Sequence, residues 1–336
     1  MVLRAEMKGG NAISAAFTAL WRGLGGDELS ADIASSILAQ KHLSTMRTGR
    51  FAPALRALVG ARAYDVDTAL LALLDGGQDQ AKSSPCANVD AAVFAQYLAG
   101  DSSADPIAWE QRWEYLDRKN DLQTLSTVHA KEASSDGEAV VARHVPMRLP
   151  QGRHVVVSLG SGFDVRCQEN SFGACSAWIR VDRAVVQQCA IECCRLSRGC
   201  QKCAFIEGDV CATSTGDKIL KCLAPRSKEE SDSHGTSTIW LAEGLMEYLK
   251  PEQQRSVLQV ISRVQAQLNG VGYLIFPILD DNIEQPLRDH YGAQFGWKFS
   301  DLDRLRALLT DEGWRVKETK AMVWGSILEA SMHVEE

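Results

Sequence analysis

The sequence has no excess of positive charge, no long apolar run and no leader-like start, and each absence argues against a class of protein. Lys and Arg number 36 against 43 Asp and Glu, so a net charge of -7 gives no bulk electrostatic reason to expect a nucleic acid partner. No stretch approaches the roughly 18 uninterrupted apolar residues of a membrane span. Residues 1–10 carry charge but no apolar core of signal-peptide length. We therefore expect a cytoplasmic protein with no membrane or nucleic acid partner.

Two common catalytic signatures are also missing. The sequence has no Ser/His/Asp signature of a nucleophilic hydrolase and no P-loop. Its hydrophobic content of 45% and charged content of 24% are ordinary for a soluble globular protein. The chemistry must therefore be sought in the organisation of the chain.

Cysteine is plentiful, and nine of the ten cysteines lie in residues 167–222. A secreted disulfide scaffold is short and loop-rich, whereas this segment reads as regular α/β structure, which favours reduced thiols. Cys200 and Cys203, with Cys189 and Cys193 nearby, have the ligand type of a tetrahedral zinc site. However, Cys189 and Cys193 lie one helical turn apart and Cys203 starts an expected strand, where cysteine acts as a small buried hydrophobe. We predict no metal.

The chain divides into three expected regions. Residues 1–75 show only helical patterns, including Ala and Leu at helical spacing over 51–74, and are predicted to form a helical lid. Residues 76–150 begin with a Gly-, Gln- and Ser-rich linker and are interpreted as an accessory insertion. Residues 151–336 are expected to form the ligand-binding core.

The core region alternates between strand and helix patterns. Strands are expected at 154–159, 177–181, 203–207, 238–242 and 272–278, with helices at 183–196, 251–268 and 301–312 and two further β-like runs at 315–318 and 326–334. This alternation predicts an α/β fold with a largely parallel sheet and helices on both faces.

The first of these strands runs directly into a glycine turn with an acid, Gly160-Ser161-Gly162-Phe163-Asp164. A nicotinamide or flavin site prefers a third small residue, but Val165 stands at that position, and Asp164 would repel a diphosphate. S-adenosylmethionine has no phosphate and carries a sulfonium and an ammonium, which an acidic loop favours. A plain glycine turn of another α/β protein is the alternative.

The next strand ends at Asp182, which lies 22 positions after Gly160. An acid at about this spacing grips the ribose hydroxyls of an adenosine ligand. A solvated cap of the following helix is the alternative. The register of strand, glycine loop and acid favours the ribose role.

Two more strands end in acids. Asp209 follows the third strand, where it or a backbone amide would contact the adenine amino group; a helix cap or a loop acid is the alternative. Glu243 follows the apolar run 239–242, where a buried acid needs a partner. That partner is either a cationic ligand or a lysine or arginine of the protein.

Four acids at the ends of four consecutive strands are more specific together than any one alone. In sequence order they resemble the leucine carboxyl methyltransferase family of class I S-adenosylmethionine-dependent methyltransferases, whose motifs are G-A-G-x-D-T, E-V-D, D-L and A-E-G-x-x-x-Y-L. Here these read 160–165, 180–182, 209–210 and 242–249. The resemblance implies a Rossmann-like seven-stranded sheet with one antiparallel strand near the C-terminus and an N-terminal helical lid. It implies S-adenosylmethionine contacts by Gly160, Ser161, Gly162, Asp164, Asp182, Asp209, Val210 and Glu243.

The resemblance also implies residues outside these motifs. The family has an arginine turn that reaches the donor carboxylate; Arg47 is our first candidate, and Arg62 is a second match. His290 and Tyr291 fall where relatives place part of the substrate cavity, and Tyr248 belongs to the fourth motif; these three are candidate catalytic residues. We expect O-methylation of a carboxylate or hydroxyl, preferably of a small molecule, with a protein C-terminal leucine or donor binding without catalysis as alternatives.

Overall fold

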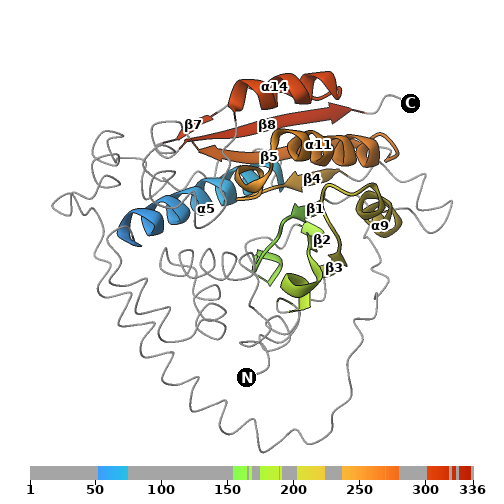
Figure 1. Ribbon diagram of the computed structural model, residues 1–336, viewed down its shortest axis with the longest axis horizontal. Helices are drawn as coiled ribbons and strands as arrows, with labels where there is room; N and C mark the ends of the chain where they lie inside the picture. The colour runs from blue at the N-terminus through green and yellow to red at the C-terminus, as the bar shows by residue number, and fades with distance from the viewer. Residues whose placement is uncertain are drawn as a thin grey trace, which may run out of the picture.

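A computed structural model describes the core region and one N-terminal helix (Figure 1). The described residues are 52–74, 154–164, 166–168, 175–188, 190, 203–223, 237–268, 270–279, 301–317, 320–322 and 325–333. The helices are α5 (Ala52–Leu74), α9 (Thr213–Leu223), α11 (Pro251–Gln265) and α14 (Leu302–Asp311), with 3-10 turns η2 (Arg166–Gln168) and η4 (Met246–Tyr248). The strands are β1 (His154–Leu159), β2 (Cys175–Asp182), β3 (Cys203–Glu207), β4 (Thr238–Leu241), β5 (Val271–Leu279), β6 (Arg315–Val316), β7 (Lys320–Met322) and β8 (Gly325–His333).

The strands form one mixed sheet in the order β3-β2-β1-β4-β5-β8-β6, with short β7 paired to β8. Strands β1 to β5 pair in parallel, whereas β8 runs antiparallel to β5, β6 and β7. The order reverses direction at β1 and β4, which is where open α/β sheets bind ligands beyond the carboxyl ends of the strands. The predicted α/β architecture, a largely parallel sheet with an antiparallel strand near the C-terminus, is confirmed, and the short β7 joins the seven strands of the main path as an eighth.

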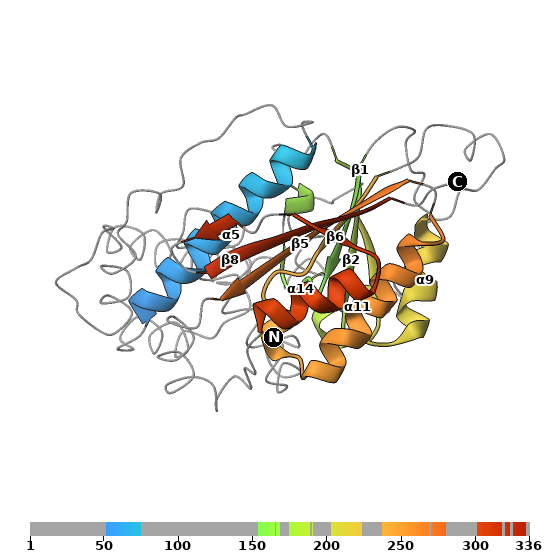
Figure 2. The same ribbon diagram turned by 90° about the horizontal axis from the view of Figure 1, so that it is seen from above.

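Helices lie on both faces of the sheet (Figure 2). Helices α9, α11 and α14 lie side by side on one face, and α5 lies on the other face against β5. The central strands are therefore covered on both faces, which explains why β1 is a continuous apolar run rather than an alternating one. Of the region predicted as a lid, the structure describes only α5.

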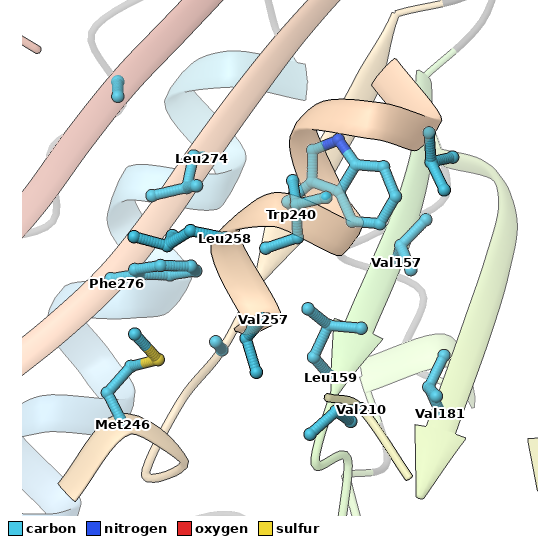
Figure 3. Close-up of a cluster of buried hydrophobic side chains, with 14 of the residues drawn as sticks. Val157, Leu159, Val181, Val210, Trp240, Met246, Val257, Leu258, Leu274 and Phe276 are labelled. Atoms are coloured by element: carbon cyan, nitrogen blue, oxygen red, sulfur yellow. The ribbon is translucent and has the colours of Figure 1, made fainter. Parts of the chain in front are cut away.

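The main hydrophobic core lies between the sheet and the helices α9, α11 and α14 (Figure 3). Trp240 of β4 is fully buried there beside Leu258 of α11, and its indole N–H donates to Gln265 Oε1 at 3.0 Å. Gly272 lies close by, because a Cβ at that position would meet Gln265 Cδ at 2.5 Å. The core thus fixes β4 firmly, and β4 leads directly into the loop with Glu243.

Several element boundaries differ from the sequence prediction. Strand β3 has the predicted bounds, β4 ends one residue earlier and α11 ends at Gln265 rather than Leu268. Helix α9 was not predicted. Its sequence is mostly polar, and only a narrow stripe is buried, which consists of Thr215, Gly216, Ile219 and Leu223.

Four cysteines, Cys167, Cys203, Cys211 and Cys222, are thiols that form no disulfide. Cys203 begins β3 as predicted. Cys189, Cys193 and Cys200 lie outside the described residues. That these cysteines bind no metal therefore stays a prediction. Among the helices that the structure describes, none has the length and apolar character to cross a membrane.

Candidate functional site

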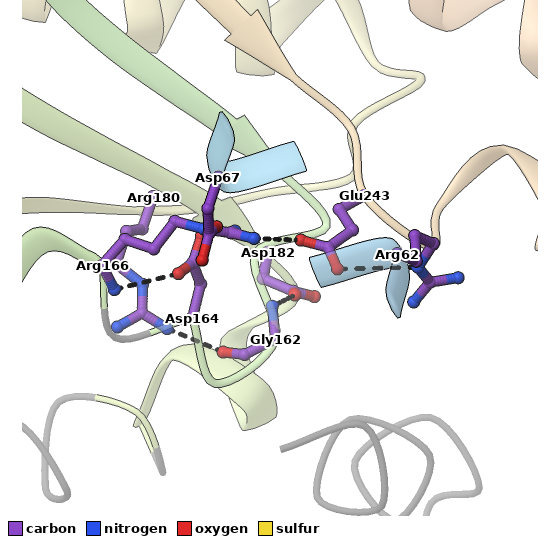
Figure 4. Close-up of polar contacts among 8 residues, drawn as sticks. All are labelled: Arg62, Asp67, Gly162, Asp164, Arg166, Arg180, Asp182 and Glu243. Carbon is purple, nitrogen blue, oxygen red and sulfur yellow. Dashed lines mark hydrogen bonds and ion pairs between the residues drawn. The ribbon is translucent and has the colours of Figure 1, made fainter. Parts of the chain in front are cut away.

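The glycine loop, residues 160–164, follows β1 directly and lies at the carboxyl ends of the parallel strands. Gly160 and Gly162 have φ values of 60° and 52°, a left-handed backbone that side chains rarely adopt. A Cβ on Gly160 would also lie 2.9 Å from Leu245 Cδ1, so the loop packs tightly against the segment after β4. The buried Arg180 of β2 donates to Gly162 O at 2.8 Å and so ties the loop to β2 (Figure 4).

Asp182 ends β2 beside this loop and is bonded to it. The Gly162 N–H donates to Asp182 Oδ2 at 2.7 Å, and the Arg183 N–H donates to Oδ1 at 2.7 Å. Each carboxylate oxygen keeps acceptor capacity for a further donor. The structure therefore brings together the glycine loop and the acid that the sequence predicted as the ribose ligand.

The pKa of Asp182 lies above its ordinary value of 3.8, because burial outweighs the backbone hydrogen bonds from Gly162 and Arg183 and the nearby charge of Arg180. Ribose hydroxyls would donate to the ionised form, so acidification through this raised pKa should weaken donor binding. In the free protein, acidification through this pKa should make the contribution of Asp182 to the free energy of unfolding more favourable, since protonation relieves the cost of burying its charge.

We therefore expect donor affinity to fall on acidification at a higher pH than for an ordinary aspartate. The measurement is titration calorimetry between about pH 4.5 and 6.5, a window in which an α-amino group of the donor, with a pKa of about 7.7–8.0, stays charged. Asp182→Asn should remove this dependence. If Asp182→Asn had the same pH dependence of donor affinity as the wild type, the titrating group would be another one.

Asp164 and Glu243 meet at one cation, Arg166. Its guanidinium contacts Asp164 Oδ2 at 3.1 Å and Glu243 Oε2 at 2.6 Å, and its Nε donates to Asp67 of α5 (Figure 4). Burial alone would lower the pKa of Arg166, but the three carboxylates raise it well above its ordinary value. The negative charge of Asp164 is therefore balanced by Arg166, rather than presented alone to a ligand as the sequence analysis assumed.

Arg62 of α5 approaches the same acid from the other side (Figure 4). Its Nε lies 3.5 Å from Glu243 Oε1, and its Nη1 lies 3.9 Å from Glu247 Oε1. Arg62 is buried, and its Nε makes no hydrogen bond. Gly244, with φ 66°, gives it room, since a Cβ there would lie 3.1 Å from Arg62 Nη2. The loose ion pairs leave this guanidinium able to bind a further carboxylate.

The end of β3 is built differently. Asp209 is exposed, and its Oδ1 accepts from the Cys211 N–H at 3.0 Å in the turn before α9. Val210 is buried in the core. Burial first, and then Asp209, raise the pKa of the Cys211 thiol to about 11, so this thiol is protonated at neutral pH. Asp209 has the turn role that the sequence analysis named as the alternative, and its predicted adenine contact remains a prediction.

The remaining predicted residues are divided between described and undescribed segments. Tyr248 is half-buried in η4, two positions after the buried Met246 and on the same loop as Glu243. Arg47, His290 and Tyr291 lie outside the described residues. Of the two arginine candidates, the structure places only Arg62, and it places that residue at the site.

Sequence reasoning missed Arg166 and Asp67. They are separated by 99 positions, and Arg166 and Glu243 by 77, so no local pattern links them. The one available signal was that buried acids need partners, a condition that the sequence analysis raised for Glu243 and left open.

The family model for leucine carboxyl methyltransferase matches residues 92–262, about half of the chain. The match begins within the range interpreted as an insertion, covers the glycine loop, Asp182 and Glu243, and ends in α11. No curated protein matches the chain by sequence.

Three solved structures similar to this chain are distant from it in sequence. An O-methyltransferase family protein from Burkholderia thailandensis is 11% identical, over 55% of this chain and 52% of that chain, with a TM-score of 0.39. Human N-acetylserotonin methyltransferase in complex with SAM is 15% identical, over 53% and 47%, with a TM-score of 0.35. Magnesium protoporphyrin IX methyltransferase from Synechocystis with bound SAH is 12% identical, over 53% and 73%, with a TM-score of 0.34. The matched region spans about half of the first two proteins.

Proposed function

Because this chain belongs to the leucine carboxyl methyltransferase family, an S-adenosylmethionine-dependent family, we propose that it transfers a methyl group from that donor to a carboxylate or hydroxyl oxygen of a small molecule. The observation that carries the proposal is the direct hydrogen bond between Gly162 and Asp182, 2.7 Å long, at the switch point of the sheet.

The residues at this edge fit the donor in charge and polarity. Ser161 is buried, and its hydroxyl has no hydrogen-bond partner, as expected of a group that awaits a polar ligand. Carboxylates also outnumber guanidinium groups in the neighbouring network: Asp67, Asp164, Glu243 and Glu247 against Arg62 and Arg166. A ligand with a sulfonium and an ammonium suits this excess of negative charge.

Each group has a separate role in the proposal. Asp182 holds the ribose hydroxyls, the glycine loop lies against the donor backbone, and Arg62 binds the donor carboxylate by paired hydrogen bonds. The bound donor supplies an electrophilic methyl group on a sulfonium. The chain then has to align the acceptor oxygen and exclude water, which matters more in such a displacement than acid catalysis.

The acceptor determines whether a base is needed. A carboxylate is already ionised at neutral pH and needs none, whereas a phenol or alcohol does. His290, Tyr291 and Tyr248 are the proposed residues at the acceptor side. Methylation of a C-terminal leucine carboxylate is a second candidate, favoured by the description of the matching family.

We expect Arg62→Ala to weaken donor binding more than Arg47→Ala, because Arg62 is the arginine beside Glu243. Loss of a charge-assisted carboxylate contact should reduce affinity by about tenfold. Titration calorimetry of both variants makes the comparison. The reverse order would move the carboxylate contact to Arg47.

The experiment that tests the function combines donor binding with methyl transfer. The protein is incubated with isotope-labelled S-adenosylmethionine and a cell extract, and mass spectrometry searches separately for labelled metabolites and labelled proteins. A labelled small acid or alcohol supports the proposal, and a labelled protein C-terminus supports the second candidate. Donor binding without any labelled product would indicate a non-catalytic binding protein.

A further inference from the structure

Arg166 joins three separate parts of the protein at one point. It is fully buried and contacts Asp164 in the glycine loop, Glu243 after β4 and Asp67 in α5. The first two contacts lie within the sheet edge. The contact with Asp67 is different, because it ties a helix of the opposite face to that edge.

Helix α5 is therefore attached to the sheet edge through two charges of opposite sign. Asp67 binds Arg166, and Arg62 lies near Glu243 and Glu247. The two attachments differ in quality. Asp67 makes a close, hydrogen-bonded ion pair with Arg166, whereas the ion pairs of Arg62 are 3.5 Å and 3.9 Å long and its Nε has no hydrogen bond.

We propose that Asp67 is a positioning residue for donor binding: through Arg166 it sets α5, and Arg62 with it, against the donor-binding edge. This inference rests on the proposed function, because it takes Arg62 as the group that binds the donor carboxylate. The ion pairs of Arg62 with Glu243 and Glu247 are long, at 3.5 Å and 3.9 Å, and hold its guanidinium only loosely. The position of its guanidinium depends on where α5 lies, and the Asp67–Arg166 pair is a close, hydrogen-bonded tie between α5 and the edge.

The network also explains why this tie does not compete with the donor. A donor carboxylate at Arg62 would draw that guanidinium away from Glu243 and Glu247, which loosens one attachment of α5. The Asp67–Arg166 pair involves neither Arg62 nor a proposed donor contact. It can therefore hold α5 in place while Arg62 changes partner.

The test uses Asp67→Asn, Asp67→Glu and two ligands. The Asp67 side chain is 29% exposed, so its substitution leaves the core intact. S-adenosylmethionine has the carboxylate, whereas 5′-methylthioadenosine shares the adenosine part but has no amino acid group. Asp67→Asn should weaken S-adenosylmethionine binding by about fivefold to tenfold and leave methylthioadenosine binding unchanged. Asp67→Glu should restore most of the loss.

The matched control is Asp217→Asn, which removes an ion pair of 2.5 Å with Arg263 between α9 and α11. It should change neither affinity. In the background of Arg62→Ala, Asp67→Asn should have no further effect on S-adenosylmethionine binding, because the two act through the same contact.

The outcomes separate this inference from the proposed function. If the wild type binds neither ligand, the proposed donor site fails. If the wild type binds both and Asp67→Asn weakens both equally, or weakens neither, the positioning role of Asp67 is overturned while the donor site remains. Additivity with Arg62→Ala would also overturn it.

Discussion

Replacing Asp182 with alanine is expected to weaken S-adenosylmethionine binding by at least tenfold, about 1.4 kcal/mol. The carboxylate is the proposed acceptor for the ribose hydroxyls, and it also accepts from the Gly162 N–H at 2.7 Å. The variant therefore loses a ligand contact and a tether of the glycine loop together. Titration calorimetry at neutral pH measures the loss.

A conservative variant and a control variant show whether the loss comes from the charge of Asp182. Asp182→Asn keeps the size and one oxygen acceptor but not the charge, so it should bind more tightly than the alanine variant and less tightly than the wild type. Glu252→Gln, in the first turn of α11, removes an exposed acid and should have no effect. Unchanged affinity in Asp182→Ala would remove the ribose assignment.

Replacing Arg166 with methionine is expected to lower the free energy of unfolding by about 3–5 kcal/mol, because it removes the closest positive charge from two buried carboxylates. Asp164 and Glu243 are both mostly buried, at 6% and 9% side-chain exposure. Urea denaturation monitored by circular dichroism gives the value for the wild type and the variant.

The size of this defect should depend on pH. Without Arg166 the neighbouring carboxylates ionise less readily in the folded state, so their folded pKa values rise and the defect should shrink as the pH falls through them. Arg263→Met is the comparison, because its ion pair with Asp217 is exposed, and it should cost less than about 1 kcal/mol. An equally small loss in Arg166→Met would show that the buried carboxylates are satisfied without it.

The sheet and half of the site were predictable because their signals are local. A covered parallel strand is a continuous apolar run, and a run that stops at a glycine or an acid marks the strand end within a residue or two. This is why β1, β3 and the positions of Gly162 and Asp182 followed from the sequence. Parallel strands then bring their carboxyl ends to a common edge, which placed Glu243 there as well.

The partners of those acids were not predictable from one sequence. Arg166 resembles a surface residue until α5 and the loop after β4 surround it, and those segments meet only in the folded chain. The choice between Arg47 and Arg62 had the same limit, since the short stretches around both arginines resemble the family's arginine motif. Helix α9 was missed because a stripe containing Thr215 and Gly216 lacks the apolar residues that mark a buried face.

Glu243 constrains how this site can evolve. Its two oxygens face different arginines, Arg166 on one side and Arg62 on the other. The two arginines therefore cannot diverge independently, because a substitution of either one changes the charge balance that the other experiences through the shared carboxylate. Substitutions at positions 62 and 166 should therefore be non-additive, although the two side chains come from different segments of the chain. A lineage that loses Glu243 would come under selection at both arginines at once.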